Sequence, residues 1–68
     1  MMPQLRSSNL ANADYNAENR LLTVEFKGGS VYTYSDVDQA TYDGLMTAAS
    51  PGSYFAQHIK DKFTWTKG

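Results

Sequence analysis

The sequence predicts an α+β domain, a three-stranded antiparallel β-meander with two C-terminal α-helices packed on one face. Apolar and polar residues alternate with a period of two up to Tyr34, and beyond it apolar residues recur with a period of about 3.6. A Ser50-Pro51 boundary then divides the helical half into two. We expect residues 1–68 to form a single domain, with residues 1–6 frayed because they carry no pattern.

The first predicted strand covers residues 7–15. Leu10 and Tyr15 are its only large apolar residues, so its periodicity is weak. Asn16 to Asn19 follows as a turn, because Asn side chains hydrogen-bond to nearby backbone groups. The next strand starts directly after this turn, which makes the sheet a meander.

A β-hairpin over residues 22–34 is the best-defined predicted element. Leu22, Val24 and Phe26 alternate with polar residues, which is the pattern of a strand with one buried face. Gly28-Gly29 supplies a turn that accepts positive φ.

Two registers are open for this hairpin. A two-residue Gly-Gly loop pairs Phe26 with Val31 and places the following tyrosines opposite polar residues. A three-residue loop with Gly29 in the left-handed conformation instead pairs Val24 with Tyr32. We favour the second register, because only that one collects the large apolar side chains on one face. These are Leu22, Val24, Phe26, Tyr32 and Tyr34.

The first helix is predicted from Asp36 to Ala49. Ser35 is placed to act as its N-cap, and the acidic residues that follow it favour the positive end of the helix dipole. Gly44 inside the helix costs about 1 kcal/mol relative to alanine. We expect it to let a strand approach closely.

The second helix is predicted from Pro51 to Phe63. Proline suits the first helical position because the N–H group that it lacks has no partner there, and Ser50 precedes it as the N-cap. Phe55, Ile59 and Phe63, four residues apart, form the buried stripe.

The composition restricts the environment of the protein. No cysteine is present, which is typical of a reducing compartment. No apolar run approaches the roughly 20 residues of a membrane span, so we expect a cytoplasmic protein that does not contact a membrane. The formal net charge of -1 argues against a grip on long nucleic acid through many phosphate contacts. A small anionic ligand needs far fewer cations.

Aromatic residues are numerous for a chain of 68 residues, with one Trp, five Tyr and three Phe. A single core of this size is only marginally stabilising and does not hide so many rings. We therefore expect a homodimer or tetramer, in which some of the aromatic side chains face a partner or a ligand.

An ordered series of residues runs through the chain: Ser7-Ser8, Leu10, Tyr15, Leu22-x-Val24-x-Phe26-x-x-Gly29-x-x-Tyr32-x-Tyr34, Ala49-Ser50-x-Gly52-x-Tyr54-Phe55 and Ile59-Lys60. This series resembles the KTSC domain, named for the C-terminal region of some lysyl-tRNA synthetases. Asp38 departs from the proline that is common in the family, and Ala56 from a common asparagine. The resemblance implies a stand-alone bacterial or phage protein of this fold. RNA binding is implied only through the attachment to a synthetase.

The inventory of reactive side chains argues against an enzyme. His58 is the only histidine, and neither cysteine nor a paired-histidine spacing is present. The acidic residues Asp36, Asp38 and Asp43 are explained by helix capping and solvation. We therefore expect no catalytic residue, no metal site and no cofactor.

The N-terminus of the second helix is the main candidate for binding. The backbone N–H groups of Gly52, Ser53 and Tyr54 have no partner inside the helix, and a phosphate suits such a helix end. Capping by Ser50 explains the same residues.

Other candidates supply hydroxyl groups, rings or positive charge around that helix end. Tyr32 and Tyr34 are expected to pack beneath the helices, with stacking on a base as the alternative. The predicted ligand-binding residues are Ser7, Ser8, Tyr15, Ser50, Gly52, Ser53, Tyr54, His58, Lys60 and Trp65.

The functional hypothesis is a non-catalytic module that captures a small phosphate-bearing ligand, a nucleotide or cyclic nucleotide, in a pocket shared between subunits. A phage would use such a protein to sequester a host nucleotide signal. The alternatives are an RNA- or tRNA-binding accessory module and a protein-interaction module that uses the sheet and Trp65.

Overall fold

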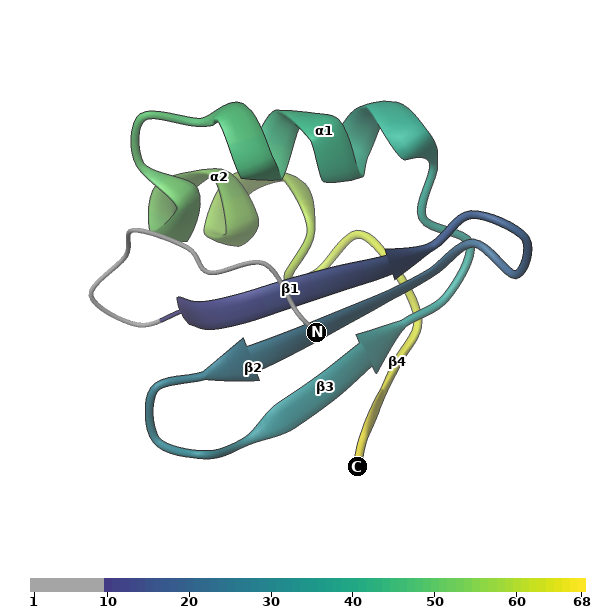
Figure 1. Ribbon diagram of the computed structural model, residues 1–68, viewed down its shortest axis with the longest axis horizontal. Helices are drawn as coiled ribbons and strands as arrows, with labels where there is room; N and C mark the ends of the chain where they lie inside the picture. The colour runs from purple at the N-terminus through teal and green to yellow at the C-terminus, as the bar shows by residue number, and fades with distance from the viewer. Residues whose placement is uncertain (1–9) are drawn as a thin grey trace.

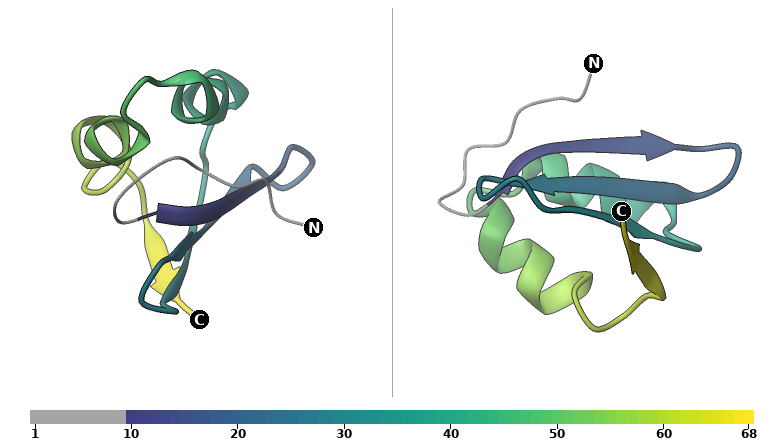
Figure 2. Two further views of the ribbon diagram at one scale, coloured as in Figure 1. Left: turned by 60° about the vertical axis from the view of Figure 1, so that its left-hand side comes forward. Right: turned by 90° about the horizontal axis from the view of Figure 1, so that it is seen from below.

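The computed structural model describes residues 10–68, which form a four-stranded sheet and two helices (Figure 1). The elements in chain order are β1 (Leu10–Asn16), β2 (Leu21–Phe26), β3 (Val31–Tyr34), α1 (Gln39–Thr47), α2 (Pro51–His58) and β4 (Trp65–Lys67). Both helices lie on the same side of the sheet (Figure 2). The predicted α+β architecture is confirmed.

The sheet has the order β1-β2-β3-β4 with every neighbouring pair antiparallel. The prediction of three strands is wrong, because β4 adds a fourth strand beside β3. Its three residues are all exposed, so the strand has no buried face and leaves no alternating pattern in the sequence. Within residues 10–68, neither helix has the length and apolar character that a membrane span requires.

The hairpin adopts the favoured register. Val24 lies opposite Tyr32, and the loop is closed by hydrogen bonds from Phe26 N to Ser30 O (2.8 Å) and from Gly29 N to Phe26 O (2.9 Å). Gly29 has a φ of 95°, the left-handed region that favours glycine. The apolar face of the hairpin therefore points toward the helices, as predicted.

The first strand begins the described part of the chain. Residues 7–9 of the predicted strand lie outside the described residues, and β1 continues one residue beyond the predicted end, to Asn16. The Asn16 side chain accepts a hydrogen bond from Asn19 N (3.1 Å), which confirms the predicted turn and its mechanism.

Helix α1 begins three residues later than predicted, and Ser35 is not its N-cap. Asp36 has a φ of 60°, which interrupts the helix, and Ser35 N donates to Thr64 O instead (2.8 Å). Asp38 occupies the N-cap position and accepts a hydrogen bond from the Thr41 hydroxyl (2.5 Å). The helix also ends at Thr47, before the predicted Ala49.

Helix α2 begins at Pro51 after Ser50, as predicted, but it ends at His58 and not at Phe63. Ile59 N and Lys60 N both donate to Phe55 O, which closes the last turn of the helix. The Ser50 hydroxyl donates to the Ser53 hydroxyl (3.1 Å), so the Ser50 side chain makes no capping hydrogen bond to the backbone of the helix. The chain then turns back toward the sheet and reaches β4.

The core lies between the helix-facing side of the sheet and the two helices. Leu22, Val24 and Ile59 are fully buried within it. Phe63, predicted as a core residue, is only half-buried because it lies beyond the end of α2. The buried apolar residues are Leu10, Ala13, Leu22, Val24, Tyr34, Val37, Leu45, Phe55 and Ile59.

Candidate functional site: an aromatic pocket

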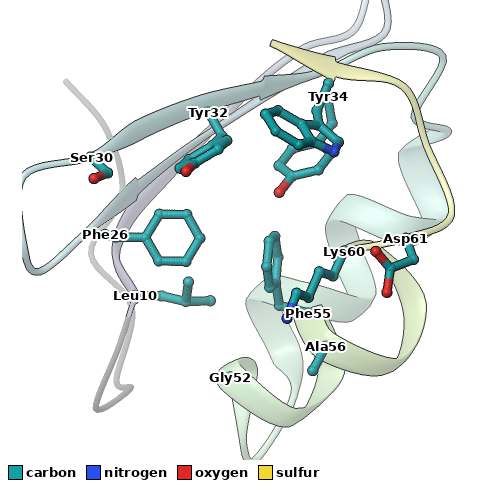
Figure 3. A pocket seen from close by; sticks show the side chains of 11 residues that line it. Leu10, Phe26, Ser30, Tyr32, Tyr34, Gly52, Phe55, Ala56, Lys60 and Asp61 are labelled. Carbon is teal, nitrogen blue, oxygen red and sulfur yellow. The ribbon is translucent and has the colours of Figure 1, made fainter. Parts of the chain in front are cut away.

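A pocket of about 510 Å³ opens where the hairpin, α2 and β4 meet (Figure 3). Its floor and walls come from segments far apart in the sequence, including the start of β1 and the turn after α2. The lining residues are Leu10, Phe26, Ser30, Tyr32, Tyr34, Gly52, Phe55, Ala56, Lys60, Asp61 and Trp65.

Five of the lining residues are aromatic. Phe55 of α2 meets Phe26 of β2 and Tyr34 of β3 edge to face, each at 5.5 Å between ring centroids. Tyr32 continues the series, 5.5 Å from Phe26 and 5.1 Å from Trp65. Such edge-to-face contacts hold each ring through its neighbours, so the pocket is preformed.

The hairpin register explains why these rings converge. Phe26, Tyr32 and Tyr34 lie on the same face of neighbouring strands because side chains alternate across a sheet. Trp65 lies opposite Tyr34 in the pairing of β3 with β4. Phe55, on the buried side of α2, closes the remaining wall from the helix layer.

Tyr34 presents its hydroxyl group to the pocket. The side chain as a whole is only 3% exposed, and in Figure 3 its oxygen points into the space between the sheet and α2. The hydroxyl makes no hydrogen bond within the described part of the chain. Every fully buried side-chain oxygen or nitrogen atom there has a partner, so the Tyr34 oxygen is not fully buried. Burial, followed by the nearby Tyr32 and Asp61, raises the pKa of Tyr34 above its ordinary value.

Charged groups stand at the rim. Lys60 and Asp61, exposed residues that follow α2, both line the pocket. Lys67 of β4 places its ammonium nitrogen 6.0 Å from the centroid of the Tyr32 ring, at the outer limit of a cation–π contact. The pocket therefore combines an apolar interior with one ammonium group and one carboxylate among its lining residues, and the ammonium group of Lys67 lies beside the Tyr32 ring.

Three of the predicted ligand-binding residues line this pocket, namely Gly52, Lys60 and Trp65. Ser50 and Ser53 lie at the start of α2 near Gly52, but both are exposed and neither lines the pocket. The predicted helix end is thus brought to the pocket through its glycine alone, and the expectation of a free N–H group at Tyr54 is wrong because Tyr54 N donates to Ser50 O (3.0 Å).

The remaining predicted site residues lie elsewhere. Tyr15 stacks on Tyr42 at 5.1 Å and donates its hydroxyl hydrogen to Val37 O (2.5 Å). Tyr54 faces α1 and contacts His58, with 4.5 Å between the ring centroids. Ser7 and Ser8 lie outside the described residues. The structure therefore does not bring the predicted residues together as one set.

Sequence reasoning did not assign most of the pocket lining to a site. Phe26, Tyr32, Tyr34 and Phe55 were expected in the core, and Asp61 carried no role in binding. The surplus of aromatic residues was the available signal, since it indicated that some rings remain open to a ligand. Ala56, at the position where the resemblance implies asparagine, also lines the pocket and contributes no polar group to it.

Residues 10–68 contain no group of three or more His, Cys, Asp or Glu side chains that is arranged to hold a metal ion. His58 is exposed on the last turn of α2 and contacts Tyr54. The rings, the Tyr34 hydroxyl and the charged side chains that line the pocket offer stacking, hydrogen bonding and charge.

Within residues 10–68, a four-stranded antiparallel sheet, two helices on one face and an aromatic pocket define a small α+β domain. The sequence model of the KTSC domain matches residues 6–63, and the chain belongs to the KTSC domain family.

The fold and the sequence have close counterparts. The crystal structure of a KTSC domain protein from Yersinia pestis matches with a TM-score of 0.93 and 30% identity, over 100% of this chain and 96% of that chain. An uncharacterised protein of Stutzerimonas stutzeri is 38% identical over 56 residues, 82% of this chain and 79% of that protein.

Some relatives are much longer proteins. A lysine–tRNA ligase of Trichormus variabilis is 41% identical over 51 residues, 75% of this chain. A similar ligase of Nostoc punctiforme is 41% identical over 49 residues, 72% of this chain. In each case the match spans only 9% of the ligase.

Proposed function

We propose that this protein is a non-catalytic binding module that captures a small phosphate-bearing aromatic ligand, a nucleotide or cyclic nucleotide, in the aromatic pocket. The observation that carries the proposal is the set of rings around one preformed cavity. Phe26, Tyr32, Tyr34, Phe55 and Trp65 all line it.

The interior of the pocket suits a planar base. Its volume of about 510 Å³ falls within the roughly 300–1,000 Å³ that is typical of small-molecule sites. Stacking of a base on an aromatic side chain contributes about 1–3 kcal/mol. Trp65, which is 49% exposed, offers such a surface at the mouth of the pocket.

The rim suits a phosphate. Lys60 lines the pocket, and Lys67 stands beside the Tyr32 ring, so two ammonium groups are available to one ligand. Gly52 brings the first turn of α2 to the pocket without a side chain, and the N–H groups of a helix end favour an anion.

Isothermal titration calorimetry with nucleosides and with mono-, di- and cyclic nucleotides tests this proposal. We expect nucleotides to bind, and nucleosides to bind at least tenfold more weakly. Lys60→Gln should remove most of that difference. Lys62→Gln is the matched control, because Lys62 is exposed and does not line the pocket. Absence of binding by every nucleotide would overturn the proposal.

A second candidate function is the binding of single-stranded RNA, with one base held in the pocket. It is favoured by the relatives that are lysine–tRNA ligases, because a domain attached to such an enzyme has access to tRNA. RNA binding predicts an affinity that rises with RNA length and falls steeply with salt. A filter-binding series over both variables separates it from capture of a single nucleotide.

Two further hypotheses stay predictions. Sequestration of a host nucleotide signal by a phage protein requires tight binding of one such signal. A protein-interaction module would instead use the exposed Trp65, and pull-down with the wild type and Trp65→Ala tests for a protein partner.

A further inference from the structure

We propose that Asp61 and the Tyr34 hydroxyl together recognise the Watson–Crick edge of guanine, so that the pocket prefers guanine nucleotides. This inference rests on the proposed function, because it concerns which base the same pocket selects.

The Tyr34 hydroxyl is the first part of the argument. The Tyr34 ring packs edge to face against Phe55, and the residue is only 3% exposed. The oxygen nevertheless opens onto the pocket and has no hydrogen-bond partner within residues 10–68. Because no buried side-chain oxygen or nitrogen atom of residues 10–68 lacks a partner, this oxygen is reached by water in the free protein and is available to a ligand.

Asp61 is the second part. It lies on the turn after α2 and lines the same pocket (Figure 3). Its negative charge is felt at Tyr34, whose pKa it helps to raise, after burial and Tyr32. A carboxylate only accepts hydrogen bonds, and its two oxygens accept a pair of parallel N–H donors.

Guanine is the base that matches this arrangement. Its Watson–Crick edge presents two adjacent donors, N1–H and the 2-amino group, beside the acceptor O6. Adenine and cytosine each present one amino group beside an acceptor nitrogen, and uracil places a single N–H between two acceptors. A carboxylate therefore pairs with guanine through two bonds, and the phenolic hydroxyl of Tyr34 can donate to O6.

A guanidinium group, as in an arginine side chain, also presents two parallel donors and stacks on aromatic rings. The rim argues against it. Lys60 lines the pocket and Lys67 lies 6.0 Å from the Tyr32 centroid, so a cationic ligand meets two like charges. In a nucleotide, by contrast, the neutral base pairs with Asp61 and the phosphate is attracted by the ammonium groups.

Calorimetric titration with GMP, IMP, AMP, UMP and argininamide tests the inference. IMP differs from GMP only by the missing 2-amino group, so we expect GMP to bind at least tenfold more tightly than IMP or AMP. Asp61→Asn should reduce GMP affinity to that of IMP while AMP affinity changes less than threefold. Tyr34→Phe, which removes only the hydroxyl group, should weaken GMP several-fold.

The controls keep the outcomes distinct. Asp14→Asn makes the same change of charge at an exposed β1 residue outside the pocket and should leave GMP affinity unchanged. Near-ultraviolet circular dichroism reports whether each variant keeps its aromatic packing.

Each contrary outcome has its own meaning. Equal binding of GMP, IMP and AMP, or an Asp61→Asn variant that still prefers GMP, would overturn the guanine inference and leave nucleotide binding intact. Binding of argininamide without any nucleotide would overturn both and indicate a guanidinium site. Absence of all binding would overturn the proposed function itself.

Discussion

Gly44 of α1 packs directly against the ring of Tyr54 of α2. A Cβ atom on Gly44 would lie 2.6 Å from Cζ of Tyr54 and 2.9 Å from its Cε2, closer than side-chain atoms approach one another. The expectation that this glycine admits a strand is wrong, because the close neighbour is a side chain of the other helix. The contact joins the two helices of the layer that covers the sheet.

Gly44→Ala should therefore destabilise the protein. The gain in helix propensity is about 1 kcal/mol, but overpacking costs typically about 1–3 kcal/mol, so we expect a net loss in the free energy of unfolding measured in urea. In a Tyr54→Ala background, where the obstacle is removed, the same substitution should be neutral or stabilising. An equal loss in both backgrounds would show that Tyr54 is not the obstacle.

The two glycines of the hairpin loop should differ in their response to alanine. Gly29 has a φ of 95°, so Gly29→Ala should lower the free energy of unfolding by about 1–2 kcal/mol. Gly28 has no positive φ and open space around its Cα, so Gly28→Ala should be neutral or stabilise by up to about 1 kcal/mol. Denaturant unfolding of the pair measures the difference, and similar effects at both positions would contradict the observed loop.

Stability should fall in alkaline solution. Burial is the main cause that raises the pKa of Tyr34 and of Tyr42 above the ordinary value of 10.0. The unfolded chain therefore loses these protons at lower pH than the folded one, so their contribution is complete below pH 10 and is lost as pH rises through the folded-state pKa values.

The free energy of unfolding between about pH 8 and about pH 11 measures this loss. Tyr34→Phe should make the decline shallower, because one of the two groups no longer titrates. A slope that is identical in the wild type and in this variant would show that Tyr34 does not contribute.

Trp65→Ala should affect binding more than stability. The side chain is 49% exposed and its main contact is the Tyr32 ring, so we expect a loss of about 0.5–1.5 kcal/mol in stability. Nucleotide affinity should fall at least tenfold, because one stacked base contributes about 1–3 kcal/mol. Trp65→Phe, which keeps a ring, should retain most of the affinity. A Trp65→Ala variant with wild-type affinity would remove Trp65 from the site.

A homodimer or tetramer was predicted from the chain length and the aromatic surplus. We expect a second copy to enclose further a ligand held in the pocket that this chain lines. Light scattering coupled to size-exclusion chromatography should show a mass of at least twice 7.6 kDa. A monomer that binds nucleotide with a stoichiometry of one would contradict the shared pocket and preserve the proposed function.

The sequence by itself determined the elements whose signals are local. Alternation along residues 22–34 specifies a half-buried hairpin, and the demand for one apolar face selects the register with Gly29 in the left-handed conformation, because a shift by one residue exchanges the faces. Ser50-Pro51 marks the start of α2 for an equally local reason, since proline suits the first turn of a helix.

Only the tertiary structure decided where the chain ends its helices and where a ligand fits. The positive φ of Asp36 and the pairing of Ser35 with Thr64 delay α1, and β4 exists because β3 offers it an edge. The pocket depends on the same long-range contacts. Phe26 and Phe55 show the same sequence pattern whether their rings fill a core or line a cavity. The space between the sheet and the helix decides between these two, and local periodicity does not encode that space.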